Sequence, residues 1–199
     1  MTFCNITGMK LLLASQSPRR IELLRNAGFD FEAVPSGIDE GMPFSVESPE
    51  DYARRLARAK ALSVAAHAPS GSMVLGADTV VTINGLILGK PSGPCDATRM
   101  LRMLSGQTHE VITAICLVRA PHEIAALRHE TTFVTFGTLN EEEIRAYVAS
   151  REPFDKAGAY AIQGLAAKFV TGISGCYFNV VGLPVPLLYK TLKTLAGGS

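Results

Sequence analysis

The sequence predicts an α/β fold, because stretches typical of strands and of helices alternate along its 199 residues. Short aliphatic and β-branched runs, such as "LLLA" and "VLGADTVVTI", have the length and composition of buried strands. Between them lie stretches in which apolar residues recur every three or four positions, the spacing of an amphipathic helix. No internal repeat or long linker divides the sequence, so we expect residues 10–199 to form a single domain and residues 1–9 a loose N-terminal tail.

Capping and turn residues delimit the first elements. We expect a strand over residues 10–14, followed by a helix that Ser17 would cap, that Pro18 would open and that Gly28 would end. The stretch "SPEDYARRLARAKALSVAAHA" predicts a second helix capped by Ser48, with acidic residues in its first turn. The first part of the chain therefore reads as strand, helix, helix.

The remaining elements follow the same pattern. The run "SMVLGADTVVTI" predicts a strand, Asn84 with its following glycine predicts a hairpin turn into "LILGKP", and a helix is expected to begin at Asp96. Two further strands are expected in "HEVITAICLV" and "ETTFVTFGTL", before a helix that begins with Asn140 and Glu143 in capping-box spacing. After a glycine-rich stretch, a last helix is expected from Pro184.

Composition and charge exclude several classes of function. The 19 basic and 18 acidic residues nearly balance, so any attraction for anions must come from local clusters, and without tryptophan a nucleic-acid binder is disfavoured. No stretch approaches the ~18 apolar residues of a membrane span. The cysteines lie far apart, which fits neither a zinc site nor a disulfide framework, so we expect reduced thiols in a cytoplasmic protein. These cysteines are Cys4, Cys95, Cys116 and Cys176.

The stretch "LLLASQSPRR" places paired arginines where a strand is followed by a helix. The N-terminus of a helix already favours phosphate, and Arg19 and Arg20 would add bidentate donors to it. Ser15 and Ser17 could donate further hydrogen bonds. The alternative is that both arginines are solvated residues of the first turn, although cations at this end oppose the helix dipole.

Asp78 is an acidic residue inside an apolar strand. A buried carboxylate must be paired, bound to metal or exposed to a cleft, so Asp78 is either catalytic or a structural aspartate held by backbone N–H groups. With Lys60, Lys90 and Lys156 it would form a basic pocket around one carboxylate, which suits a polyphosphate substrate and a divalent metal. The carboxylate would hold the metal or activate water, and the sequence leaves both roles open.

Six blocks in this order resemble the Maf proteins, nucleoside triphosphate pyrophosphatases: "LLASQSPRRIELL", "GIDE", "LGADTVV", "LGKP", "MLRMLSGQTHEVITAI" and "FDKAGAYAIQG". The resemblance extends from about Lys10 to Leu192. It implies an elongated, two-lobed mixed sheet flanked by helices, related to the inosine triphosphate pyrophosphatases, with a central cleft. It also implies hydrolysis of a nucleoside triphosphate to the monophosphate and pyrophosphate with a divalent cation, Mg²⁺ or Mn²⁺, and it leaves a homodimer open.

The resemblance also implies roles for individual residues. Asp78 matches the proton acceptor of the family, and Glu40 in "GIDE" would help to position the metal. The positions of Arg19, Thr79 and Gln163 are associated with base selectivity. The residues that match phosphate ligands are Ser15, Arg19, Arg20, Lys60 and Lys90.

Gln163 in "AYAIQG" resembles the branch of the family that acts on dTTP and UTP, whereas the branch that acts on 7-methyl-GTP tends to carry glutamate there. A carboxamide offers a donor and an acceptor to the edge of uracil or thymine, and a carboxylate cannot donate. Modified pyrimidine nucleotides are a related substrate class. Gln163 could instead be an ordinary loop residue. The resemblance also leaves open a regulatory binding protein, since Maf proteins are associated with arrest of septum formation. A pure binder would have no need of Asp78 within an apolar strand.

Overall fold

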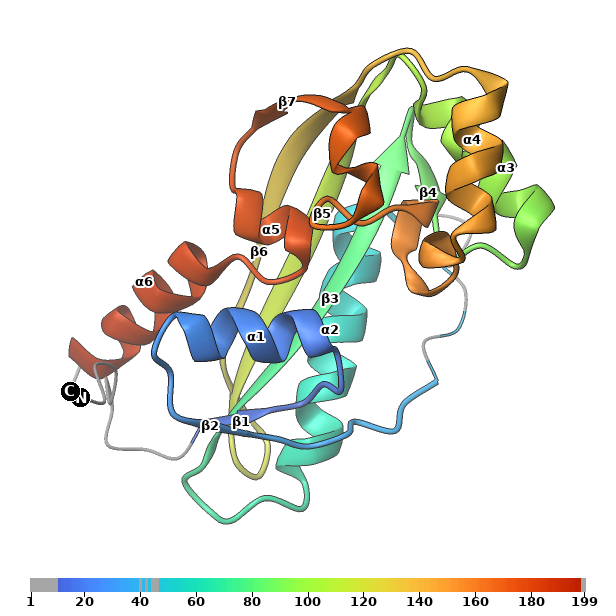
Figure 1. The fold of residues 1–199 in the computed structure, drawn as a ribbon. Helices are drawn as coiled ribbons and strands as arrows, with labels where there is room; N and C mark the ends of the chain where they lie inside the picture. Colours follow the sequence, from blue (N-terminus) through green and yellow to red (C-terminus); the bar gives the residue numbers. More distant parts are fainter. Residues whose placement is uncertain (1–10, 40, 42, 44–46, 198–199) are drawn as a thin grey trace. The chain divides into compact units, whose positions relative to one another are not determined.

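A computed structural model describes residues 11–39, 41, 43 and 47–197 of the chain (Figure 1). The predicted tail over residues 1–9 lies outside the described residues. The elements, in chain order, are β1 (Leu11–Leu13), α1 (Pro18–Asn26), β2 (Phe31–Ala33), α2 (Pro49–Ala65), β3 (Met73–Ile83), β4 (Leu86–Leu88), α3 (Pro94–Leu104), β5 (Thr108–Arg119), β6 (Glu123–Phe136), α4 (Glu141–Ala149), the 3₁₀ helices η1 (Glu152–Asp155), η2 (Ala157–Ala159) and η3 (Leu165–Phe169), β7 (Val170–Ser174), α5 (Tyr177–Val181) and α6 (Val185–Gly197).

The strands form a mixed sheet in the order β2-β1-β3-β5-β6-β7, with β4 paired to β3. Strand β1 pairs in parallel with both β2 and β3, whereas the β3–β4 and β6–β7 pairs are antiparallel. The predicted α/β fold, a mixed sheet flanked by helices, is confirmed. The chain divides into two compact units, which consist of residues 1–78, 113–130 and 182–199, and of residues 79–112 and 131–181. The single domain over residues 10–199 and the central cleft stay predictions.

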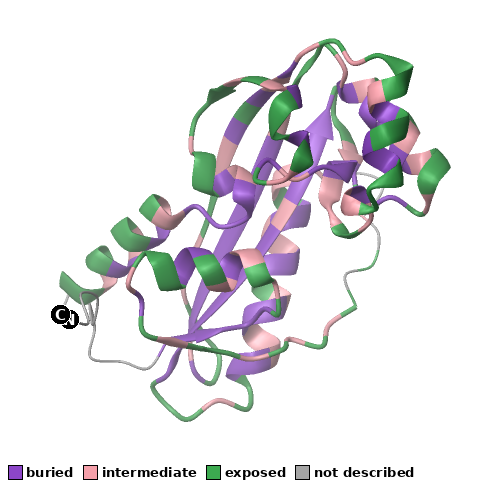
Figure 2. Ribbon diagram, in the orientation of Figure 1, coloured by how far each residue is buried: buried purple, intermediate pink, exposed green. Residues whose placement is uncertain are grey.

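The first unit is built around the parallel strands β2, β1 and β3. The chain leaves β1 through α1 to reach β2 on one side, then returns through α2 to β3 on the other side of β1. Because crossovers between parallel strands are right-handed, these opposite directions place α1 and α2 on opposite faces of the strands, as Figure 1 shows. Nearly every residue of β1 and of the first half of β3 is buried (Figure 2).

The second unit has an aromatic core. The rings of His109, Phe136 and Tyr160 meet edge to face, with centroids 4.9–5.4 Å apart. Tyr147 of α4 meets Phe169 of η3 in the same way at 5.4 Å. Edge-to-face contact is the arrangement that aromatic quadrupoles prefer, and these side chains bury large apolar areas, so this cluster anchors the irregular segment between α4 and β7.

The structure corrects several local predictions. Ser17 stands at the N-cap position of α1, but its side chain makes no capping hydrogen bond, and its N–H donates to the Ser15 hydroxyl at 3.1 Å. Helix α3 begins at Pro94 rather than at Asp96, and β6 begins well before the predicted "ETTFVTFGTL" run. Strands β2 and β7 and helix α5 were not expected. By contrast, Ser48 accepts from a backbone N–H of α2, and the capping box of α4 is present.

Candidate active site

The turn after β1 holds Ser15 and Arg20 together. Both side chains are buried, and the Arg20 guanidinium donates through Nη1 to the Ser15 hydroxyl at 3.4 Å. Its Nε donates to the carbonyl oxygen of Gly182 at 2.9 Å, which ties the start of α1 to the segment before α6. A solvated first-turn arginine is therefore the wrong description of Arg20. Arg19, the neighbouring residue, is half-buried.

Lys60 and Asp78 form a buried ion pair. The Lys60 ammonium lies 2.5 Å from Oδ1 of Asp78, and the side chains are only 9% and 8% exposed. The pairing answers the question that the sequence raised about Asp78, since a carboxylate within an apolar strand would cost several kcal/mol if no charge or donor compensated it. The pairing also explains how Lys60 can be buried on α2 together with Leu56 and Ala61.

A close contact between α2 and β3 brings this pair together. Gly76 lies two residues before Asp78, and a Cβ there would stand 2.1 Å from the Ala57 carbonyl oxygen and 2.6 Å from the Ala61 nitrogen. Ala57 and Ala61 are fully buried, so α2 meets the strand through alanines and a glycine. The resulting backbone approach holds the Lys60 ammonium within hydrogen-bond reach of Asp78.

The register of β1 and β3 relates Asp78 to the turn after β1 that carries Arg19 and Arg20, here called the arginine turn. In the parallel pairing of β1 and β3, Leu13 stands opposite Leu75, and the Ala14 N–H donates to the Leu75 carbonyl oxygen at 2.8 Å. Ser15 thus leaves the carboxyl end of β1 beside the part of β3 that leads to Asp78. Since the chain turns to opposite sides of β1 on its way to β2 and to β3, this is a topological switch point, where open α/β sheets bind ligands.

The second unit carries the other predicted ligands. Thr79 is half-buried on β3, whereas Lys90 after β4 and Gln163 before η3 are exposed. The Gly158 N–H donates to the carbonyl oxygen of Gly89 at 3.1 Å, so the backbone beside Lys90 is bonded to the glycine-rich segment that leads to Gln163. The meeting of these residues with Asp78 around one substrate stays a prediction.

Two further predictions concern Lys156 and the metal. The Lys156 ammonium donates to the Glu152 carbonyl oxygen at 3.0 Å and lies 2.5 Å from Asp155. Glu40 lies outside the described residues. Within the ranges that the structure describes, no three His, Cys, Asp or Glu side chains form a group that could hold a metal.

The comparisons with known proteins decide the family. The family model described as "Maf-like protein" matches residues 10–195. The chain belongs to the Maf-like protein family. Its relatives include "dTTP/UTP pyrophosphatase" of Koribacter versatilis, which is 50% identical over 186 residues and 94% of each chain. The protein of the same name from Geotalea uraniireducens is 51% identical over 93% of this chain and 94% of that protein. Nearly the whole of this Maf-like chain therefore corresponds to these relatives.

Solved structures support the fold of this Maf-like protein. A Ham1 protein from Staphylococcus aureus matches with a TM-score of 0.52 at 13% identity, over 96% of this chain and all of that one. A HAM1 protein from Coxiella burnetii matches with a TM-score of 0.50 at 15% identity and the same coverage. At such low identity the likeness concerns the fold alone. None of the helices in the described part of the chain is long and apolar enough to cross a membrane.

Sequence reasoning missed two parts of this site. The close approach at Gly76 could have been inferred, because an isolated glycine within a strand pattern often marks a place where another backbone comes near. The contact of Arg20 with the Gly182 carbonyl oxygen could not have been inferred from the sequence. Every residue has a backbone carbonyl oxygen, so the residue type at position 182 does not mark it as the acceptor.

Proposed function

We propose that this Maf-like protein hydrolyses nucleoside triphosphates to the monophosphate and pyrophosphate, with UTP and dTTP as its substrates. The observation that carries the proposal is the 50% identity, over 94% of each chain, to a relative named dTTP/UTP pyrophosphatase. The buried pair of Lys60 and Asp78, together with Arg19 and Arg20 in the arginine turn, supports it, because a triphosphate site needs both cations and a proton acceptor. The cytoplasmic location and a homodimer stay predictions.

In the proposed reaction one water is consumed. A bond forms between the water oxygen and the α-phosphorus, the anhydride bond between the α- and β-phosphates breaks, and pyrophosphate leaves. Asp78 takes the proton of the water, and Lys60 orients the carboxylate by donating to Oδ1. Arg19, Lys90 and the Ser15 hydroxyl bind phosphate oxygens, and Arg20 also fixes the turn through Gly182.

We propose a divalent ion that takes most of its ligands from the substrate. Mg²⁺ is commonly held by one or two carboxylates together with substrate phosphates and water, which does not require a cluster of three acidic side chains. If Asp78 holds the metal instead of taking the proton of the water, Asp78 would be one protein ligand and Glu40 would be a second. When bound, Mg²⁺ or Mn²⁺ would neutralise negative charge on the triphosphate.

The test measures pyrophosphate release from UTP, dTTP, CTP, GTP and 7-methyl-GTP, with Mg²⁺, with Mn²⁺ and with a chelator. Wild type should turn over UTP and dTTP in a metal-dependent reaction. Asp78→Asn should lower kcat by far more than about tenfold, equivalent to roughly 1.4 kcal/mol, while triphosphate binding is retained. Asp30→Asn, at an exposed aspartate, is the matched control.

Each contrary outcome has a distinct meaning. Wild type that binds triphosphates without hydrolysing them would point to the regulatory binder instead. A preference for 7-methyl-GTP would assign the protein to the second branch of the family. If Asp78→Asn kept more than about a tenth of wild-type kcat, the assigned role of Asp78 would be wrong.

A further inference from the structure

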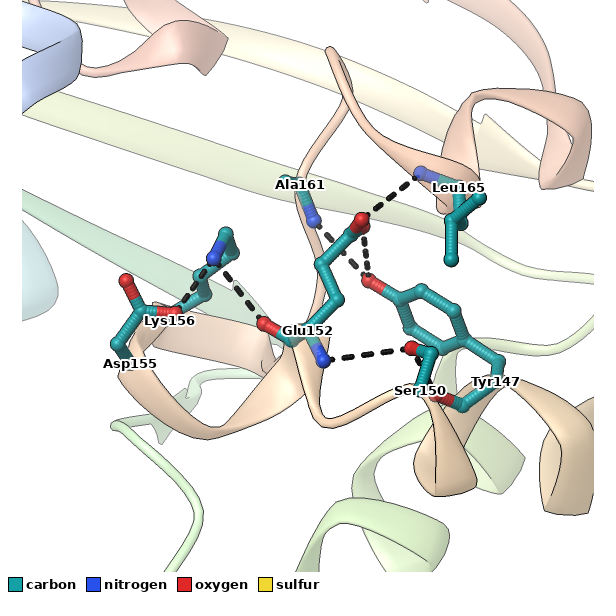
Figure 3. A network of polar contacts seen from close by, with 7 residues as sticks. All are labelled: Tyr147, Ser150, Glu152, Asp155, Lys156, Ala161 and Leu165. Carbon is teal, nitrogen blue, oxygen red and sulfur yellow. Dashed lines mark hydrogen bonds and ion pairs between the residues drawn. The ribbon is translucent and has the colours of Figure 1, made fainter.

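The side chains of Tyr147 and Glu152 hydrogen-bond to the backbone on either side of Gln163, at Ala161 and Leu165 (Figure 3). The Gly164 N–H donates to the Ala161 carbonyl oxygen at 3.1 Å, which closes a turn with Gln163 at its third position. Leu165, immediately after the turn, donates its N–H to Oε2 of Glu152 at 3.0 Å. The Ala161 N–H, at the other end, donates to the Tyr147 hydroxyl at 3.4 Å.

Tyr147 and Glu152 are also hydrogen-bonded to each other, so the contacts at the two ends of the turn belong to one hydrogen-bond network. The Tyr147 hydroxyl donates to Oε1 of Glu152 at 2.9 Å. Burial, and next the hydrogen bond to Glu152, raise the pKa of Tyr147, so the phenol keeps the proton that it donates. The edge-to-face contact with Phe169 holds the Tyr147 ring in place.

The backbone around Glu152 is itself fixed. Arg151 has φ 66°, in the left-handed region, and this reverses the chain between the end of α4 and η1. The Glu152 N–H donates to the Ser150 hydroxyl at 3.3 Å, and the Lys156 ammonium donates to the Glu152 carbonyl oxygen at 3.0 Å. The carboxylate therefore projects from an anchored segment, which suits a group that has to hold another loop in register.

Gly164 shows how closely the carboxylate approaches the turn. A Cβ at Gly164 would lie 2.4 Å from both carboxylate oxygens of Glu152, so a side chain at this position would displace the carboxylate. The contact is thus made against the backbone of the turn, one residue after Gln163. Moving the carboxylate would move the segment that carries the amide.

We propose that Glu152 and Tyr147 are positioning residues for base selectivity, which fix the Ala161–Leu165 turn so that Gln163 presents its amide to the pyrimidine edge. The proposal rests on the proposed function, since it takes Gln163 to be the group that reads the base. The two residues act through the backbone N–H groups of Ala161 and Leu165 and need no contact with substrate.

The experiment compares kcat/KM for UTP and CTP in wild type, Tyr147→Phe, Glu152→Gln, Glu152→Ala and Gln163→Ala, and in the double variant Tyr147→Phe/Gln163→Ala. These bases differ at the edge that a carboxamide would read, so their ratio reports on the position of Gln163. Glu142→Gln on α4 and Tyr189→Phe on α6, both exposed, are the matched controls. Thermal unfolding establishes that each variant is folded at the assay temperature.

Tyr147→Phe should reduce the preference for UTP over CTP roughly tenfold, the effect expected when a well-placed hydrogen bond is lost. Glu152→Gln, which keeps an acceptor, should retain more of the preference than Glu152→Ala. In the Gln163→Ala background, Tyr147→Phe should cause no further change in the ratio, because the residue through which it acts is gone. A merely structural role would instead lower both rates in parallel in either background.

The possible failures are distinguishable. If wild type hydrolyses UTP and the Tyr147 and Glu152 variants keep its UTP to CTP ratio, the positioning role is refuted and the proposed function stands. The same holds if Tyr147→Phe changes the ratio equally with and without Gln163. If wild type hydrolyses none of the triphosphates, the proposed function fails, and the positioning role fails with it.

Discussion

Replacing Gly76 with alanine tests whether the approach of α2 to β3 positions the ion pair. The added Cβ would stand 2.1 Å from the Ala57 carbonyl oxygen, against 3.4 Å for the closest ordinary contact, so the helix backbone must retreat by about 1.3 Å. The second obstacle, the Ala61 nitrogen at 2.6 Å, belongs to the same helix, and neither atom is the end of a flexible side chain. The whole of this part of α2 would have to move.

The displacement should cost stability and activity together. Overpacking of a filled core typically costs about 1–3 kcal/mol, which in a chain of this size lowers Tm by roughly 2–4 °C per kcal/mol. The Lys60–Asp78 distance of 2.5 Å would open beyond hydrogen-bond range if α2 moved away by the full ~1.3 Å. Because a misplacement of this size can cost on the order of a hundredfold in rate, kcat/KM for UTP should fall steeply.

Thermal unfolding and the pyrophosphate assay measure the two effects. Gly197→Ala is the matched control, because a Cβ there meets nothing within 4 Å. Suppose Gly76→Ala kept both the Tm and the kcat/KM of the control. The helix would then tolerate the extra carbon, and the glycine contact could not be what places Lys60 against Asp78.

Further variants test separate parts of the site and the core. Arg19→Ala and Lys90→Ala should each lower kcat/KM for UTP by the equivalent of about 1.5–3 kcal/mol, the range for hydrogen bonds to charged groups; unchanged values in both would remove them as phosphate ligands. Gln163→Glu should lower kcat/KM for UTP and dTTP roughly tenfold to a hundredfold relative to GTP and 7-methyl-GTP, and an unaltered ranking of substrates would show that the amide does not read the base. Burial lowers the pKa of His109 from 6.5 to about 4, so below pH 6.5 the unfolded chain binds a proton that the fold excludes. Stability should therefore fall by up to about 3 kcal/mol between pH 6.5 and 4, and urea unfolding of His109→Asn should lack this part of the loss.

Local chemistry made much of the fold predictable. Helices α2 and α4 begin where Ser48 and Asn140 predict, because a capping side chain bonds a backbone N–H only a few residues away. Strands β1 and β3 follow from apolar runs whose burial is nearly continuous. By contrast, β2 and β7 are short strands that contain several exposed residues, and they exist through pairing with β1 and β6. The residues of a short segment do not indicate which strand it will pair with, so the sequence did not predict β2 and β7.

The candidate site, like the fold, was predictable from the sequence only in part. The sequence by itself singled out candidate residues for the chemistry: the arginines after a strand and an acid inside an apolar run are anomalies because each charge has a desolvation or dipole cost that residue type alone reveals. The tertiary structure decided which residues meet. Parallel register leads Ser15 out beside β3, the glycine contact at Gly76 delivers Lys60 to Asp78, and the carbonyl oxygen of Gly182 receives Arg20. Such contacts join backbone atoms and side chains far apart in the chain, and their distances follow from how closely elements pack, which no local pattern of residues contains.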